Sequence, residues 1–226
     1  ISTSVVNREL GNLAKALDLA TQALLITQQH HFHGEEISAL IRIGNVYASS
    51  KDFNKALGYF HQAEIKSAGI GNSLYVNISQ WLIASAFEQI NKLDSAEYYS
   101  EEAQRNLPFD MGAAFAYNIL GDVQIKLKKD SAALLNYWIG LKEAARLKDY
   151  RTAANLNISL ANYYKKHNQD SAIYYAKEAL AVAQFLSYKN RIISSSGILA
   201  EIYESRDPRE ALKYYKLFNA AKDSLY

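Results

Sequence analysis

Residues Asp170–Ala183 read DSAIYYAKEALAVA, an aspartate followed by alanines, tyrosines and aliphatic residues at helical spacing. Related stretches begin at Leu13, Asp52, Asp94, Asp130 and Asp207. Each can form an amphipathic helix, and no stretch alternates between apolar and polar residues as a strand would. Six variants of one helix within 226 residues predict a repeat architecture.

The copies align on one alanine, and the distance between successive alanines is 40, 40, 37, 39 and 39 residues. These alanines are Ala16, Ala56, Ala96, Ala133, Ala172 and Ala211. A second small residue follows seven positions later in the first five copies, and another precedes by eleven or twelve positions in the last five. Small residues allow two antiparallel helices to approach closely, so we expect helix pairs that stack on their neighbours.

The spacing predicts twelve helices and no strands. We expect them near 1–10, 12–28, 35–49, 52–68, 73–90, 93–106, 111–127, 130–147, 150–167, 169–186, 189–205 and 207–222. An aspartate opens the second helix of each full repeat, where its side chain can accept hydrogen bonds from free backbone N–H groups. The expected N-caps are therefore Asp52, Asp94, Asp130, Asp170 and Asp207.

The order small residue, aromatic, alanine, aromatic, alanine resembles the tetratricopeptide repeat (TPR), and in the first full copy it is carried by Gly44, Tyr47, Ala56, Phe60 and Ala63. HEAT and armadillo repeats have a similar period without this order. The resemblance implies an all-α fold, a right-handed superhelical solenoid of antiparallel helix pairs. The period of 37–40 residues is longer than the 34 residues usual in the family. The surplus residues lie between one repeat and the next. One TPR solenoid is expected over 1–226, with a partial repeat 1–33 and full repeats 34–70, 71–108, 109–148, 149–187 and 188–226.

Composition excludes several kinds of function. A net charge of +2 with dispersed Lys and Arg gives no electrostatic footprint for nucleic acid, and the absence of cysteine excludes disulfides and thiolate sites. His30, His31 and His33 could offer imidazoles to a metal, but we interpret them as a solvated turn. No serine, histidine and acid are spaced as a catalytic set. We therefore expect no enzyme, no cofactor, no metal site and no contact with nucleic acid or membrane.

In the TPR family the first helix of each pair lines the concave face, and such faces commonly bind peptides or proteins. Side-chain amides suit an extended peptide because they donate and accept hydrogen bonds at once, while aromatic rings supply flat anchors. The candidate ligand-binding residues on this face are Asn45, Trp81, Phe115, Asn118, Asp122, Asn155, Asn162 and Lys165. The alternative is that they are ordinary polar or partly buried positions. A carboxylate clamp is disfavoured, because only Arg42 and Lys165 supply suitable cations.

A narrower resemblance rests on the repeated DSAxxYYxxAL phrasing and the ending YYKLFNAAKDSLY. Both resemble the repeat regions of Bacteroidetes-type sensor histidine kinases and helix-turn-helix regulators. This implies the sensor or interaction region of a larger bacterial signalling protein in a two-component system, with an extracytoplasmic (periplasmic) array and a membrane helix downstream. The alternative is a stand-alone adaptor, and a cytoplasmic location stays open. Because the chain starts with Ile1 rather than Met, we expect it to be trimmed from a longer protein.

Overall fold

The computed structural model describes residue 4 and residues 12–105 and 112–224. This part of the chain contains eleven α-helices and no strand, as the repeat pattern predicts. The helices are α2 (Leu13–Gln29), α3 (His33–Ser49), α4 (Phe53–Gly69), α5 (Ser73–Gln89), α6 (Leu93–Arg105), α7 (Ala113–Lys126), α8 (Asp130–Leu147), α9 (Tyr150–Tyr164), α10 (Gln169–Phe185), α11 (Lys189–Arg206) and α12 (Pro208–Asp223). The helix expected near 1–10 lies outside the described residues.

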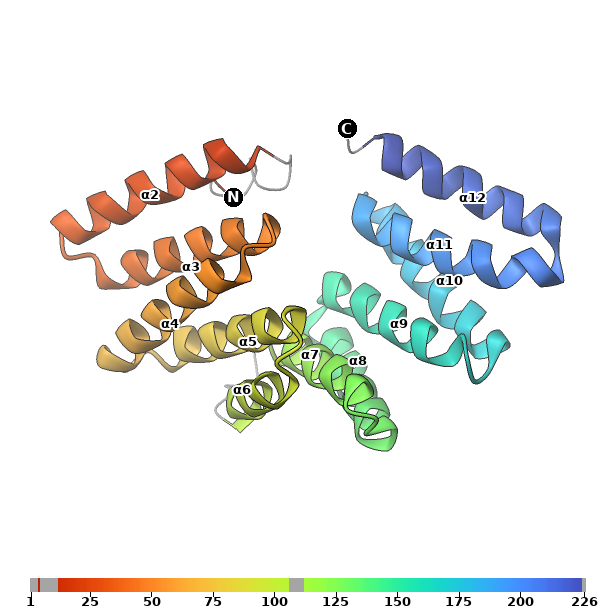
Figure 1. Ribbon diagram of the computed structural model, residues 1–226, viewed down its shortest axis with the longest axis horizontal. Helices are drawn as coiled ribbons and strands as arrows, with labels where there is room; N and C mark the ends of the chain where they lie inside the picture. Colours follow the sequence, from red (N-terminus) through yellow and green to blue (C-terminus); the bar gives the residue numbers. More distant parts are fainter. Residues whose placement is uncertain (1–3, 5–11, 106–111, 225–226) are drawn as a thin grey trace. The chain divides into compact units, whose positions relative to one another are not determined.

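Contacts between the helices divide the chain into two units, residues 1–128 and 129–226. In the first unit each helix from α2 to α6 packs against the helix that follows it, and in the second unit each helix from α8 to α11 does the same (Figure 1). The boundary falls between α7 and α8, within the expected repeat 109–148. The all-α helical-repeat fold is thus confirmed within each unit, whereas a single solenoid over 1–226 stays a prediction.

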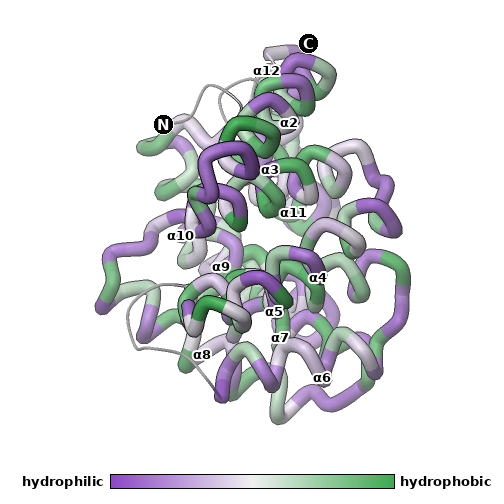
Figure 2. The backbone as a smooth tube through the Cα atoms, turned by 90° about the vertical axis from the view of Figure 1, so that its left-hand side faces the viewer, coloured by the Kyte–Doolittle hydropathy of each residue, from purple (hydrophilic) through white to green (hydrophobic). Residues whose placement is uncertain are grey.

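The aligned alanines lie in the packed interior between helices. All six are buried, and five of them have no exposed surface: Ala16, Ala56, Ala96, Ala133 and Ala172. In the pair α3–α4, Gly44 faces the ring of Phe60, which is itself 1% exposed. Hydrophobic and hydrophilic residues alternate along each helix rather than forming long blocks (Figure 2), because one side of a helix packs and the other meets solvent.

Two of the five expected N-caps are confirmed. The side chain of Asp52 accepts a hydrogen bond from the backbone N–H of Lys55, and that of Asp207 accepts from Arg209 and Glu210. The other three aspartates lie inside the first turn of their helices, so these cap assignments are wrong. Asp94 is the second residue of α6, Asp130 opens α8, and Asp170 follows the true cap Asn168.

Most helices end in the same way. The second residue after the helix, or the first after α8, adopts a left-handed backbone conformation, which lets the chain reverse into the next helix. Glycine takes this position at Gly71, with φ of 68°. Elsewhere a residue with a side chain occupies it, and these residues are His31, Lys51, Asn91, Lys128, Lys148 and Ser187.

Candidate functional site

A hollow of about 240 Å³ opens where the first helices of two successive pairs, α3 and α5, contact each other. We call it the α3–α5 hollow. Its lining from α3 is spaced three and four residues apart, so that it forms one face of the helix, while α5 adds two residues a turn apart. The lining residues are Ser4, Ser38, Ile41, Arg42, Asn45, Val46, Tyr75 and Ile78. The hollow therefore combines an amide, a guanidinium group and several aliphatic side chains.

Arg42 is the one cation that lines this hollow. Its side chain is half-buried and has no hydrogen bond or ion pair within the described part of the chain. A second hollow of about 390 Å³, between α2 and α3, shares Arg42 and Ser38 with the first. Glu35 also lines this second hollow. A partly buried guanidinium group that has no ion pair among the described residues can bind a carboxylate or carbonyl oxygen of a ligand.

The predicted residues of the first unit divide into two groups. Asn45 lines the α3–α5 hollow. Trp81 and Phe115 pack against each other, with ring centroids 4.4 Å apart, and both contact the core between α5 and α7. Asn118 is 4% exposed, and its Nδ2 donates to Oδ2 of Asp122 at 3.3 Å. Asn45 thus faces a hollow, while the other four pack or bond in two pairs, Trp81 with Phe115 and Asn118 with Asp122.

In the second unit, two of the three predicted residues connect α9 with α11, which are the first helices of two successive pairs. Oδ1 of Asn155 accepts from Nε of Arg191 at 3.0 Å, and Nζ of Lys165 lies 2.5 Å from Oε2 of Glu201. Asn162, between them on α9, is exposed. A comparable ion pair in the first unit joins Lys126 of α7 to Glu88 of α5 at 2.6 Å.

These links between successive first helices were missed by sequence reasoning. Their partners are 36 or 38 residues apart, close to one repeat period. That offset was the available signal, since opposite charges one repeat apart can meet when repeats stack. Side chains of this kind support the stacking and are less available to a ligand.

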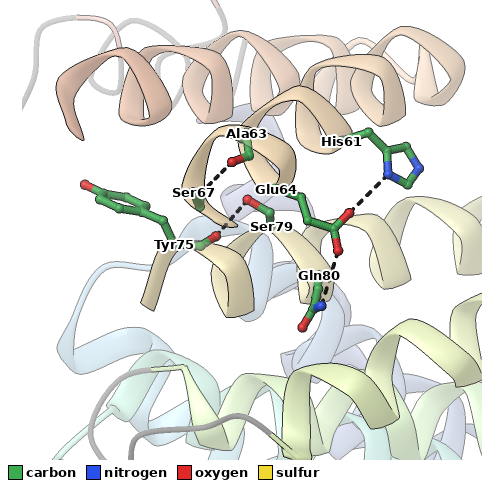
Figure 3. A network of polar contacts seen from close by, with 7 residues as sticks. All are labelled: His61, Ala63, Glu64, Ser67, Tyr75, Ser79 and Gln80. Atoms are coloured by element: carbon green, nitrogen blue, oxygen red, sulfur yellow. Dashed lines mark hydrogen bonds and ion pairs between the residues drawn. The ribbon is translucent and has the colours of Figure 1, made fainter. Parts of the chain in front are cut away.

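A polar network joins α4 to α5 (Figure 3). Glu64 is its centre: Oε1 accepts from Nε2 of Gln80 at 3.2 Å, and Oε2 lies 3.3 Å from Nδ1 of His61. The His61 ring also packs edge-on against Tyr99 of α6. Burial, together with the nearby charge of Glu64, raises the pKa of Tyr99 above its ordinary value. The network fixes α5 relative to its neighbours.

In the structure His30 and His31 lie in the turn after α2, and His33 is the first residue of α3. His30, His31 and His33 are exposed, and the His30 ring stacks on Phe32 with centroids 5.6 Å apart. Among the described residues, no three side chains of the metal-binding types come together. No helix within the described ranges has the length and apolarity needed to cross a membrane.

No protein-family model matches the sequence, and no curated protein matches it. Solved structures do. Apo RapI has a TM-score of 0.77 at 15% identity, with 97% of this chain and 80% of RapI covered. The Rap conjugation gene regulator of plasmid pLS20, in complex with the Phr* peptide, has a TM-score of 0.77 at 18% identity, with 98% of this chain and 60% of that chain covered. The apo quorum sensor NprR from B. thuringiensis has a TM-score of 0.73 at 18% identity, with 92% and 60% covered.

At these identities the likeness shows the fold: the chain has a TPR-like helical-repeat architecture. It spans about three fifths of the length of the pLS20 regulator and of NprR. The expected origin in a Bacteroidetes-type kinase or regulator stays a prediction.

Proposed function

We propose that this chain is a non-catalytic scaffold that binds a peptide segment across α3 and α5, as the sensor or interaction region of a larger bacterial signalling protein. The observation that carries the proposal is the α3–α5 hollow, where Arg42, which has no ion pair among the described residues, lies beside Asn45 and several aliphatic side chains. Ligand sites commonly combine an apolar lining with a few polar groups that fix orientation.

The chemistry of the lining defines the segment that fits. The carboxamide of Asn45 can donate to a peptide carbonyl and accept from a peptide N–H. Ile41 and Ile78 offer apolar contact to an aliphatic side chain of the ligand. Arg42 favours a neighbouring acidic side chain or carbonyl oxygen. We therefore expect a short extended peptide with an aliphatic residue next to an acidic one.

Proteins of similar fold support a peptide ligand. The structure of the pLS20 regulator is of its complex with the Phr* peptide, and NprR is a quorum sensor. For a sensor, the peptide must bind more tightly to one of two conformations, because a ligand with equal affinity for both shifts nothing. The sensor role itself is tested by the gene: a membrane helix or an output domain after Tyr226 supports it, and a stop codon there contradicts it.

A selection experiment tests the binding proposal. Random twelve-residue peptides displayed on phage would be selected against the chain, and the affinities of the enriched peptides measured by fluorescence polarisation. We expect Arg42→Gln and Ile78→Ser each to weaken binding by about tenfold, the loss of one charge-assisted hydrogen bond or one buried side chain.

Two matched variants control for general effects. Lys15 is an exposed cation on α2, and Ile65 is a 70% exposed isoleucine on α4, both outside the hollow. Lys15→Gln and Ile65→Ser should bind the selected peptides as wild type does. Selected peptides that bind Arg42→Gln and Ile78→Ser with full affinity would place the site elsewhere.

A further inference from the structure

A row of four polar side chains follows one face of α3, at spacings of three, four and three residues. These residues are Glu35, Ser38, Arg42 and Asn45. The first three line the hollow between α2 and α3, which we call the α2–α3 hollow, and the last three line the α3–α5 hollow. The row therefore runs from one hollow into the other.

The side chains of this row are free to bind a ligand. None of the four has a side-chain hydrogen bond or an ion pair within the part of the chain that the structure describes. The inner face of α9 differs, because Asn155 and Lys165 are bonded to residues of α11. Polar groups that converge on a hollow fix the orientation of a ligand there.

Glu35 and Arg42 give the α2–α3 hollow one negative and one positive group. They are seven residues apart, which is about 10 Å along a helix axis, and no ion pair joins them. Three residues of an extended peptide span the same distance, at about 3.3 Å each. A peptide that places a cation against Glu35 and an anion against Arg42 would therefore satisfy both groups.

The rest of the α2–α3 hollow is mostly aliphatic. Its apolar lining residues are Leu19, Ala20, Ala23 and Ala39. A lysine or arginine side chain can bury its methylene stem on such a surface while its charged head stays in water. Glu35 is exposed, so a cation that contacts it stays hydrated.

We infer that the peptide bound across α3 and α5 continues into the α2–α3 hollow, where Glu35 binds a cationic group of the peptide. The inference rests on the proposed function and extends it to the charge pattern of the ligand. The cationic group lies three residues away from the acidic residue that Arg42 binds. It is the side chain of a lysine or arginine, or the free α-amino group of the peptide.

A comparison of two selections tests this charge pattern. One library of random twelve-residue peptides is selected against the wild type and against Glu35→Lys. We expect the wild type to enrich a cationic group three residues from the acidic residue, and Glu35→Lys to enrich aspartate or glutamate at that position. Glu178 is an exposed glutamate on α10, and Glu178→Lys should select the wild-type pattern. Helical circular dichroism verifies that each variant is folded.

Affinity measurements then identify the cationic group. Synthetic copies of one enriched peptide are titrated by fluorescence polarisation at constant ionic strength, because exposed charges are screened. Glu35→Gln should weaken binding by about threefold to fivefold, the effect of one exposed ion pair. If the cation is a side chain, its replacement by norleucine should cause the same loss in the wild type and no further loss in Glu35→Gln. If it is the α-amino group, acetylation should do so instead.

The results separate this inference from the proposed function. Peptides that depend on Arg42 and Ile78 but bind Glu35→Gln with full affinity would overturn the role of Glu35 and leave the proposed function standing. Norleucine and acetyl peptides that lose as much affinity for Glu35→Gln as for the wild type would place the cation elsewhere. Peptides that depend on neither Arg42 nor Ile78 would contradict the proposed function, and the role of Glu35 with it.

Discussion

At the scale of single residues, two glycines in one helix pair should respond in opposite ways to the same substitution. A Cβ added at Gly44 would lie 2.6 Å from Cδ1 of Phe60 and closer still to its Cε1, in a fully packed contact. Gly58, in α4, has no atom within 4 Å of the same position. We expect Gly44→Ala to lower the free energy of unfolding by about 1–3 kcal/mol through overpacking.

Gly58→Ala should instead raise the free energy of unfolding by about 0.5–1 kcal/mol, because alanine restricts the unfolded chain and favours the helix. Urea denaturation of both variants beside the wild type measures the two values. If Gly44→Ala left the free energy of unfolding unchanged, α3 and α4 could move apart at this contact without losing stability.

Glu36 should make stability depend on acidic pH. It is 5% exposed, and its Oε1 accepts from Gln28 of α2 at 3.1 Å and from Lys66 of α4 at 3.0 Å. Burial by itself raises the pKa of Glu36, but the hydrogen bonds from Lys66 and Gln28 and the charge of Lys66 bring it below its ordinary value. The charged form is therefore favoured more strongly in the folded chain than in the unfolded one.

The direction of the pH dependence follows from the linkage between proton binding and folding. A lowered folded pKa adds stability that is fully present above the unfolded pKa of about 4.3 and is lost as the pH falls through the folded pKa. Glu36→Gln should thus cost about 1–3 kcal/mol at pH 7 and progressively less below pH about 4. Exposed Glu35→Gln is the control and should cost little at any pH. An equal cost of Glu36→Gln at pH 7 and pH 3 would contradict the assigned role.

At the scale of the elements, the helix ends carry strain that a substitution can remove. Lys51 and Lys148 follow helices in the left-handed conformation, with φ of 63° and 54°. Residues with a Cβ adopt this conformation at a cost that glycine avoids. We expect Lys51→Gly and Lys148→Gly each to raise the unfolding free energy by about 0.5–1 kcal/mol, measured by thermal denaturation.

Lys92 is a suitable comparison, because it is exposed and follows Asn91 but is not itself left-handed. Lys92→Gly should be neutral or destabilising. If all three glycine variants shift the melting temperature equally, backbone strain is not the cause.

Helix positions were predictable from sequence because small residues and aromatics recur at fixed spacing. The caps were less predictable, because several polar residues near a helix start compete for the backbone N–H groups. Asn168, with an extended backbone, takes the cap of α10, and Asp170 two residues later pairs with Arg206 at 2.6 Å. Which residue caps depends on backbone angles that spacing does not specify.

The predicted ligand-binding residues stay a prediction, and the structure shows only where each of them lies. Asn45 lines a hollow, as a ligand-binding residue should. Asn155 and Lys165 are instead bonded to the next repeat, and Trp81 packs on Phe115. The sequence shows which positions face inward, but pairing between side chains depends on how closely the helices approach.

At the scale of the whole molecule, stabilising contacts lie between neighbouring helices, so a perturbation should stay local. We expect Gly44→Ala to reduce amide protection in α2 to α5 and to leave α9 to α12 unchanged. Hydrogen exchange followed by mass spectrometry resolves this by segment. Equal loss of protection in both units would show that they unfold as one cooperative body.

The central claim is that a peptide binds across α3 and α5. The most direct measurement places the photoreactive residue p-benzoylphenylalanine at Ser38, which lines the hollow, or at Gln62, which is exposed on α4. A selected peptide is added, and crosslinks are mapped by mass spectrometry. The account predicts a crosslink from position 38 that unlabelled peptide abolishes, and none from position 62. Crosslinking from position 62 alone would contradict it.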